Sequence, residues 1–115
     1  MIYLIHIDPP VSHAKHYLGW TTPERLAVRL RHHEQGKGAR LLLAALERGA
    51  LVRLVRLWRD GSILEERRIK RTSRLAVHCP VCNEAEISEE CRQFMPLILK
   101  PPALYEVPAI ACREE

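Results

Sequence analysis

The sequence predicts an α/β domain with a small, mostly antiparallel three-stranded sheet flanked by helices. The 115 residues are enough to bury one modest core. Three short apolar segments, rich in β-branched or aromatic residues, are typical of strands. Helix-start and helix-stop residues frame three further segments. The expected order is therefore strand, strand, helix, helix, strand, helix.

The strands are expected at residues 2–7, 16–20 and 51–58. The first two are separated by DPPVSH, a turn-prone sequence, and each contains one tyrosine. The third, LVRLVRLW, ends at the turn sequence DGS. We therefore expect the first two strands to form a hairpin.

The helices are expected at residues 23–35, 41–48 and 63–74. Thr22 precedes a proline at the first helical position, and Thr21 with Glu24 is an alternative capping box. Gly36 and Gly49 follow the first two helices, as C-terminal glycines commonly do. Ser62 is the expected N-cap of the third helix.

Charge is spread unevenly along the chain. Residues 1–78 hold 15 Lys and Arg against 7 Asp and Glu, a net charge of +8, whereas residues 79–115 carry a net charge of −4. A basic body favours a polyanionic partner, although arginine-rich helices are also simply solvated. We expect residues 1–82 to form the domain and residues 83–115 to form an acidic, proline-punctuated C-terminal arm.

The N-terminal residues do not resemble a secretory signal, since they lack a basic start and a long apolar stretch. No apolar run approaches the ~20 residues that a membrane helix needs, so no membrane partner is expected. A cytoplasmic location follows as the expectation. There, the four cysteines are more often thiols or metal ligands than disulfides.

One face of the first expected helix carries a row of cations and hydrogen-bond donors. Arg25, Arg29 and His33 are spaced four residues apart and so lie on one side of the helix. The helix begins directly after the second tyrosine-bearing strand, and a Gly-Lys-Gly segment follows it. The glycines of that segment let the backbone turn closely.

Four motifs along residues 1–82 resemble the GIY-YIG nuclease family. The segments IYLI and YLG stand where the two signature tripeptides lie, with Met1 replacing the first glycine and Leu18 replacing an isoleucine. RLRHHEQGKGAR is similar to the family's Arg-Leu-x-x-His-x-x-Gly-x-Gly helix, and LEERRIKR to its later helix with a metal-binding glutamate. The motifs occur in the family's order.

The resemblance implies a metal-dependent endonuclease that hydrolyses phosphodiester bonds in DNA. Tyr3 and Tyr17 would line the site, one of them relaying a proton from the attacking water. Arg29 would clamp the phosphate and His33 would hydrogen-bond a tyrosine or the phosphate. Glu66 would hold one Mg²⁺ or Mn²⁺. A protein partner is expected to supply specificity, because the domain is small.

Two positions in this assignment have competitors. Arg29 lies twelve residues after Tyr17, two more than expected, so Arg25 is an alternative. Glu65 competes with Glu66 in the same way. Taken alone, the tyrosines would be core aromatics, and Glu66 would be half of an i,i+4 ion pair with the lysine at position 70.

The segment Cys79-Pro-Val-Cys82 has the spacing of a zinc knuckle. Candidates for the remaining zinc ligands are Cys91, Cys112 and His78. Ordinary reduced thiols are the alternative, because no second Cys-x-x-Cys follows.

Two other functions compete with the nuclease. One is a nucleic-acid-binding module on the same fold that does not cut. The other is a zinc-containing protein-interaction domain. Metal-dependent nicking of DNA separates the nuclease from both.

Overall fold

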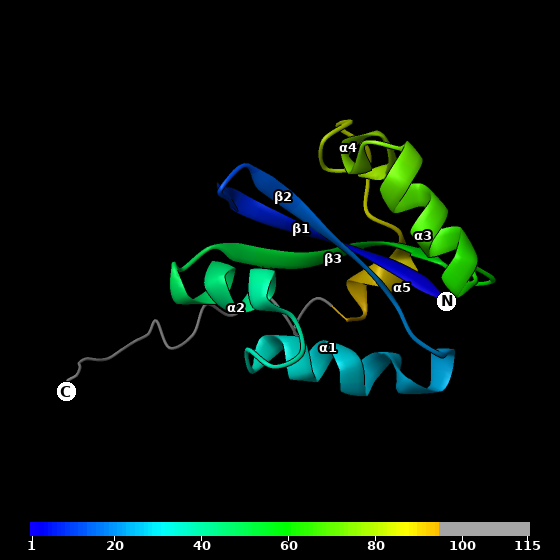
Figure 1. The fold of residues 1–115 in the computed structure, drawn as a ribbon, viewed down its shortest axis with the longest axis horizontal. Coiled ribbons are helices and arrows are strands. Elements are labelled where there is room, and N and C mark those ends of the chain that lie inside the picture. The colour runs from blue at the N-terminus through cyan, green and yellow to red at the C-terminus, as the bar shows by residue number, and fades with distance from the viewer. Residues whose placement is uncertain (95–115) are drawn as a thin grey trace.

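A computed structural model describes residues 1–94 of the chain, and its elements are shown in Figure 1. The strands are β1 (Ile2–Val11), β2 (Ala14–Trp20) and β3 (Leu51–Trp58). The helices are α1 (Leu26–Glu34), α2 (Arg40–Glu47), α3 (Ile63–Thr72), α4 (Leu75–His78) and α5 (Glu89–Arg92). The predicted fold class is confirmed: helices flank one antiparallel sheet of three strands.

The sheet order is β2-β1-β3, so β1 is central and β2 lies at an edge. Tyr3 pairs with Gly19, and His6 pairs with His16 across the hairpin. The hairpin is longer than expected, because β1 continues through both prolines to Val11. The turn narrows to Ser12 and His13, whose φ angles are 49° and 74°. Two consecutive positive φ values match the twist of hairpin strands.

The helix ends differ in how closely they follow the prediction. A 3-10 turn occupies Pro23–Arg25, and the Thr22 side chain makes no capping hydrogen bond, so α1 begins at Leu26 instead of residue 23. The predicted Ser62 cap is confirmed: its Oγ accepts a hydrogen bond from the Glu65 N–H at 3.1 Å.

The two faces of the sheet pack separate cores, because alternate residues of a strand point to opposite faces. Tyr3, Ile5 and Ile7 of β1 pack with residues of α1 and α2. Ile2 and Leu4 pack with Ile69 of α3 and with the buried Cys79, among others. Figure 1 shows α1 and α2 on one side of the sheet and α3 and α4 on the other. The first face is called the α1 face here, and the second the α3 face.

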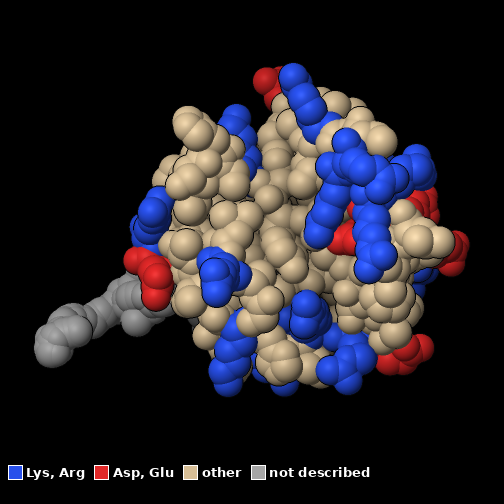
Figure 2. All heavy atoms as spheres, viewed as in Figure 1, with Lys and Arg blue, Asp and Glu red and all other residues tan. Residues whose placement is uncertain are grey.

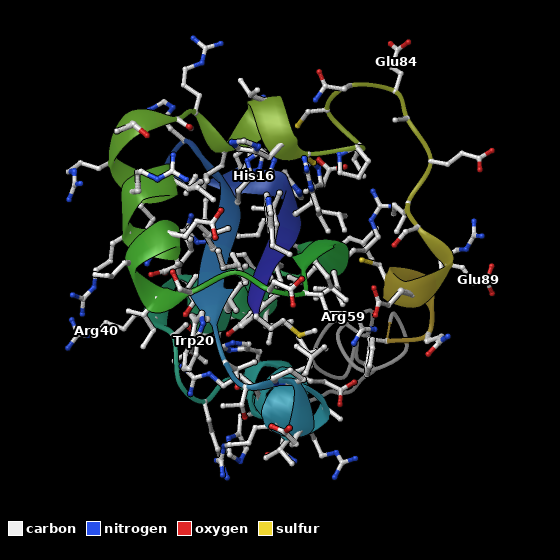
Figure 3. The ribbon with its side chains drawn as sticks, turned by 90° about the vertical axis from the view of Figure 1, so that its right-hand side faces the viewer. His16, Trp20, Arg40, Arg59, Glu84 and Glu89 are labelled. Carbon is white, nitrogen blue, oxygen red and sulfur yellow. The ribbon has the colours of Figure 1, made fainter. Side chains whose placement is uncertain are left out.

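The part of the expected arm that the structure describes packs on the domain. Helix α5 contacts β3, and Cys91 is buried in the core of the α1 face. Glu84 and Glu89 point outward from this segment, away from the body (Figure 3). The rest of the arm lies outside the described residues, and the boundary at residue 82 stays a prediction. Within residues 1–94, no helix has the length and apolar character to cross a membrane.

Candidate functional site

Four of the five predicted site residues meet on the α1 face. Tyr3 and Tyr17 come from the paired strands β1 and β2, and His33 comes from the last turn of α1. The ring centroids of the two tyrosines are 6.2 Å apart, and those of Tyr17 and His33 are 5.3 Å apart. The Tyr3 hydroxyl lies 2.8 Å from His33 Nε2. Arg29, one turn earlier on α1, approaches both hydroxyls.

Gly19 explains how the Tyr3 ring fits into this cluster. It is the residue opposite Tyr3 in the hairpin, and a Cβ built there would lie 2.5 Å from the Tyr3 hydroxyl oxygen. No real Cβ contact is that short. Gly19 therefore leaves the space that Tyr3 occupies.

Burial sets the protonation states of the tyrosine–histidine pair. Burial raises the pKa of Tyr3, although the Arg29 guanidinium opposes the rise. Burial, together with the Arg29 charge, lowers the pKa of His33 to about 4. At neutral pH both groups are therefore uncharged, and the Tyr3 hydroxyl and His33 Nε2 share one hydrogen bond.

The two tyrosines differ in access. Tyr3 is fully buried, whereas Tyr17 is partly exposed. Hydrogen bonding to Tyr3 raises the pKa of Arg29, which stays charged, and its buried Nε has no partner among residues 1–94. The cluster thus has a positive charge, one accessible phenol and no carboxylate. Chemically, it suits an anion.

Glu66, the fifth predicted site residue, lies on helix α3. Helix α3 packs along the edge strand β2, and Glu66 on it is 7% exposed. Its carboxylate forms an ion pair with Lys70 Nζ at 2.9 Å. Among the residues that the structure describes, no hydrogen bond or ion pair joins Glu66 to the four clustered residues.

The structure also places the two competitors. Glu65 is more exposed than Glu66 and pairs with Arg68 at 3.6 Å. Arg25 is exposed in the 3-10 turn before α1, while Arg29 reaches the tyrosines. Burial thus favours Glu66 over Glu65, and position favours Arg29 over Arg25.

Basic side chains gather on the surface over α1 and α3. Figure 2 shows Lys and Arg gathered over α3 at the right of the view and over α1 below, with a recessed, uncharged surface between them. The basic residues of these elements are Arg25, Arg29, Arg31, Arg67, Arg68, Lys70 and Arg71. Two basic walls about a recess suit a polyanion.

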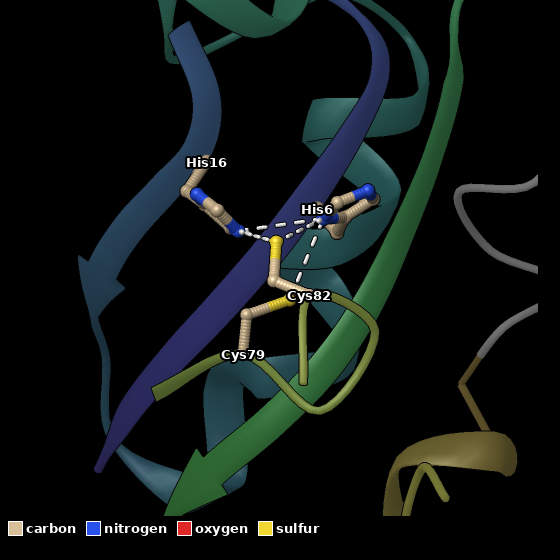
Figure 4. Close-up of side chains that lie close together, drawn as sticks. All are labelled: His6, His16, Cys79 and Cys82. Atoms are coloured by element: carbon tan, nitrogen blue, oxygen red, sulfur yellow. Dashed lines mark hydrogen bonds between the residues drawn. The ribbon is translucent and has the colours of Figure 1, made fainter. Parts of the chain in front are cut away.

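A second cluster of polar side chains lies on the α3 face, near the hairpin turn. It consists of His6, His16, Cys79 and Cys82, drawn in Figure 4. His6 Nδ1 lies 3.3 Å from His16 Nε2 and 3.4 Å from Cys79 Sγ. Cys82 Sγ lies 3.4 Å from His16 Nε2. These nitrogen and sulfur atoms could hold a metal ion such as Zn²⁺.

The sequence identified the two cysteines but named other partners for them. Cys91 is buried in the core of the α1 face, and the His78 ring packs edge-on against Trp58 at 5.6 Å. Cys112 lies outside the described residues. Both histidines that replace these candidates come from the hairpin. Spacing alone did not indicate this pair, because the turn lies at Ser12 and His13 and a register shift between His6 and Val11 brings His6 opposite His16.

The Cys79–Cys82 turn is held in shape by Asn83. Its Nδ2 donates to the carbonyls of Ala76 at 2.8 Å and Cys79 at 2.7 Å. Backbone N–H groups of Val81 and Cys82 lie against the Cys79 sulfur and lower the pKa of this thiol, while burial, the larger effect, raises it. Burial and the neighbouring His6 lower the pKa of His16 to about 4, so its ring is neutral.

A cavity of about 440 Å³ lies apart from the tyrosine cluster, between β3 and the segment from Val77 to Ser88. Its lining includes Arg56, whose Nη1 donates to the His78 carbonyl at 3.2 Å. None of the five predicted nuclease residues lines it, whereas His78 and Cys79, which the sequence offered as zinc ligands, do.

Comparison of the chain with protein-family models, curated proteins and solved structures found no match in any of the three.

Proposed function

We propose that this protein is a metal-dependent endonuclease of the GIY-YIG type that hydrolyses phosphodiester bonds in DNA. The observation that carries the proposal is the convergence of Tyr3, Tyr17, Arg29 and His33 at one place. They come from three elements, and in the sequence they belong to three separate motifs. Packing alone would not require a guanidinium, an imidazole and two phenols to meet on a strand pair.

Each residue has a part that follows from its access and charge. Arg29 binds the phosphate through its fork of donors and neutralises charge that develops on the phosphoryl oxygens. Tyr17, the accessible phenol, holds the attacking water and relays its proton. Tyr3 is a positioning residue: it is buried and is held by the neutral His33. This distribution favours Tyr17 over Tyr3 as the residue that touches the substrate.

Glu66 is the proposed ligand of one Mg²⁺ or Mn²⁺. A nearly buried carboxylate is the donor that such hard cations prefer, with water and phosphate oxygens completing the shell. A bound cation would polarise the phosphate and assist the leaving oxygen. Lys70 holds the carboxylate in its absence and must turn aside on binding.

The basic walls over α1 and α3 support DNA as the substrate class. Contacts to phosphates make binding strong at low salt and nearly independent of sequence. We therefore also propose that a protein partner supplies specificity. The cytoplasm remains the proposed location, because reduced thiols persist there.

A cleavage assay over duplex, branched and single-stranded DNA, with Mg²⁺ or Mn²⁺, tests the proposal. Tyr17→Phe removes one hydroxyl and should abolish most nicking, while Tyr3→Phe should reduce it less. Cleavage by the unaltered protein in the presence of EDTA, or no cleavage of any substrate, would refute the proposal.

A non-catalytic nucleic-acid-binding module is the second candidate. The observation that favours it is the Glu66–Lys70 ion pair, which gives the carboxylate a structural role. Salt-sensitive DNA binding without nicking under any metal condition would select this function. DNA binding that is flat between about 50 and 200 mM salt would exclude both.

A further inference from the structure

We propose that His6, His16, Cys79 and Cys82 form a closed, tetrahedral zinc site that fastens the Cys79–Cys82 turn to the β1–β2 hairpin. The site goes beyond the proposed nuclease function and does not depend on it. It lies on the α3 face, whereas the tyrosine cluster lies on the α1 face.

The separations of the four atoms fit one zinc ion. Zn–N bonds of 2.0–2.1 Å and Zn–S bonds of 2.3 Å place tetrahedral ligands about 3.3 Å apart for two nitrogens and about 3.6 Å apart for nitrogen and sulfur. The structure has 3.3 Å between His6 Nδ1 and His16 Nε2. Three of the four nitrogen–sulfur distances are 3.4, 3.9 and 3.4 Å. All four atoms lie within 4.8 Å of one another, so small side-chain rotations complete the tetrahedron.

The donor types select the metal. Thiolates and imidazoles suit Zn²⁺, whereas Mg²⁺ and Ca²⁺ require oxygen ligands. With two thiolates and two neutral imidazoles as ligands, the negative charges of the two sulfurs neutralise the charge of a divalent ion. Four protein ligands leave no open position for water or substrate, which is the arrangement of structural zinc sites.

The topology also favours a structural role. His6 and His16 are held opposite each other by the strand pairing, before any metal binds. The cysteines come from a turn about 70 residues later in the chain, already shaped by the Asn83 hydrogen bonds. Figure 4 shows the turn lying across β1 with both sulfurs directed at the histidines. Zinc would join the two ends of the described domain.

Zinc content and cobalt spectroscopy of the unaltered, tag-free protein test the site without any substitution. We expect about one zinc per chain after gel filtration. Replacement by Co²⁺ should give intense visible d–d bands of a tetrahedral ion and a sulfur-to-cobalt charge-transfer band in the near ultraviolet. A folded protein that takes up neither metal, or that is isolated with a Cys79–Cys82 disulfide under reducing conditions, would overturn the proposal.

Matched variants then identify the ligands. Cys82→Ser and His16→Ala should each lower zinc affinity by at least about tenfold. Cys91→Ser and His32→Ala, which remove the same groups outside the cluster, should retain zinc. Retention of zinc in both ligand variants would refute the assignment of these ligands, whether or not the two controls retain it. If a variant does not fold, the cobalt spectrum of the unaltered protein still decides. Cleavage of DNA is not a readout here, so failure of the nuclease proposal leaves this test intact.

Discussion

His16 and Tyr17 are neighbours on β2, yet they serve sites of opposite character. Because strand residues alternate, Tyr17 points to the α1 face and His16 to the α3 face. Residues of β1 divide in the same way, with Tyr3 on one face and His6 on the other. Figure 3 shows His16 and Trp20 toward opposite ends of β2. One hairpin thus supports two polar clusters.

The two clusters show that the charge of the residues in a cluster determines which kind of ligand suits it. The tyrosine cluster contains the Arg29 cation and no carboxylate, so it suits an anion such as a phosphate. The histidine–cysteine cluster contains four electron-pair donors and no cation, so it suits a metal ion. Histidine takes part in both, but its neighbours set its role.

The largest expected effect is on the α3 face. Removing zinc with a chelator should lower the free energy of unfolding by several kcal/mol and the melting temperature by more than about 10 °C. Thermal unfolding followed by circular dichroism, with and without EDTA, measures this. An unchanged melting temperature would mean that no metal joins the Cys79–Cys82 turn to the β1–β2 hairpin.

Next in size are substitutions in the proposed active site. Arg29→Ala and Glu66→Gln should each slow cleavage ~10²-fold or more, equivalent to ~3 kcal/mol, without altering zinc content. Arg25→Ala and Glu65→Gln are the matched controls and should be mild. If the controls are the severe variants instead, the site lies one helical turn or one residue away.

Gly19→Ala tests the close approach of the strands on the α1 face. The added Cβ would meet the buried Tyr3 ring, so we expect a loss of about 2–3 kcal/mol in unfolding free energy. Gly49→Ala is the control: its φ is +75°, but nothing lies within 4 Å. Gly19 has no positive φ, so its loss reports the contact with Tyr3 and Gly49→Ala reports backbone strain alone. A Gly19→Ala variant as stable as the unaltered protein in urea denaturation would contradict the close approach.

Tyr3→Phe should have a smaller effect on stability. The ring remains, but the buried Nε2 of His33 loses its hydrogen-bond partner, at a cost of about 1–2 kcal/mol. Urea denaturation compared with Tyr17→Phe, whose hydroxyl is more accessible, measures the difference. A neutral result for Tyr3→Phe would show that the 2.8 Å contact does not stabilise the cluster.

The smallest effect is a change in titration. The pKa of His33 is lowered to about 4 from an unfolded value of about 6.5. Between these values the unfolded chain binds the extra proton, so this residue makes stability fall as pH falls from about 6.5 to about 4. NMR titration should show the His33 ring neutral at pH 6. The pKa of His33 should rise in Arg29→Ala, because the Arg29 charge that helps to lower it is removed. A ring that is already protonated at pH 6 contradicts the assignment.

Local sequence determined much of this protein. The third strand, the Ser62 cap and the glycines after α1 and α2 depend on a few adjacent residues, and all lie where expected. The spacing of Arg29 and His33 on one helix also predicted that they share a face. These features follow from backbone geometry over one or two turns, which the sequence specifies directly.

Tertiary structure decided what depends on pairing between distant segments. The hairpin continues through both prolines, and its register brings His6 to His16, a contact that no Cys-x-x-Cys spacing indicates. Packing of the Cys79–Cys82 turn on that hairpin then determines that the cysteines meet histidines, and packing of α3 along β2 determines that Glu66 is buried. The physical reason is that strand register and helix docking minimise the free energy of the whole core, so residues some 70 positions apart become neighbours only when the chain folds.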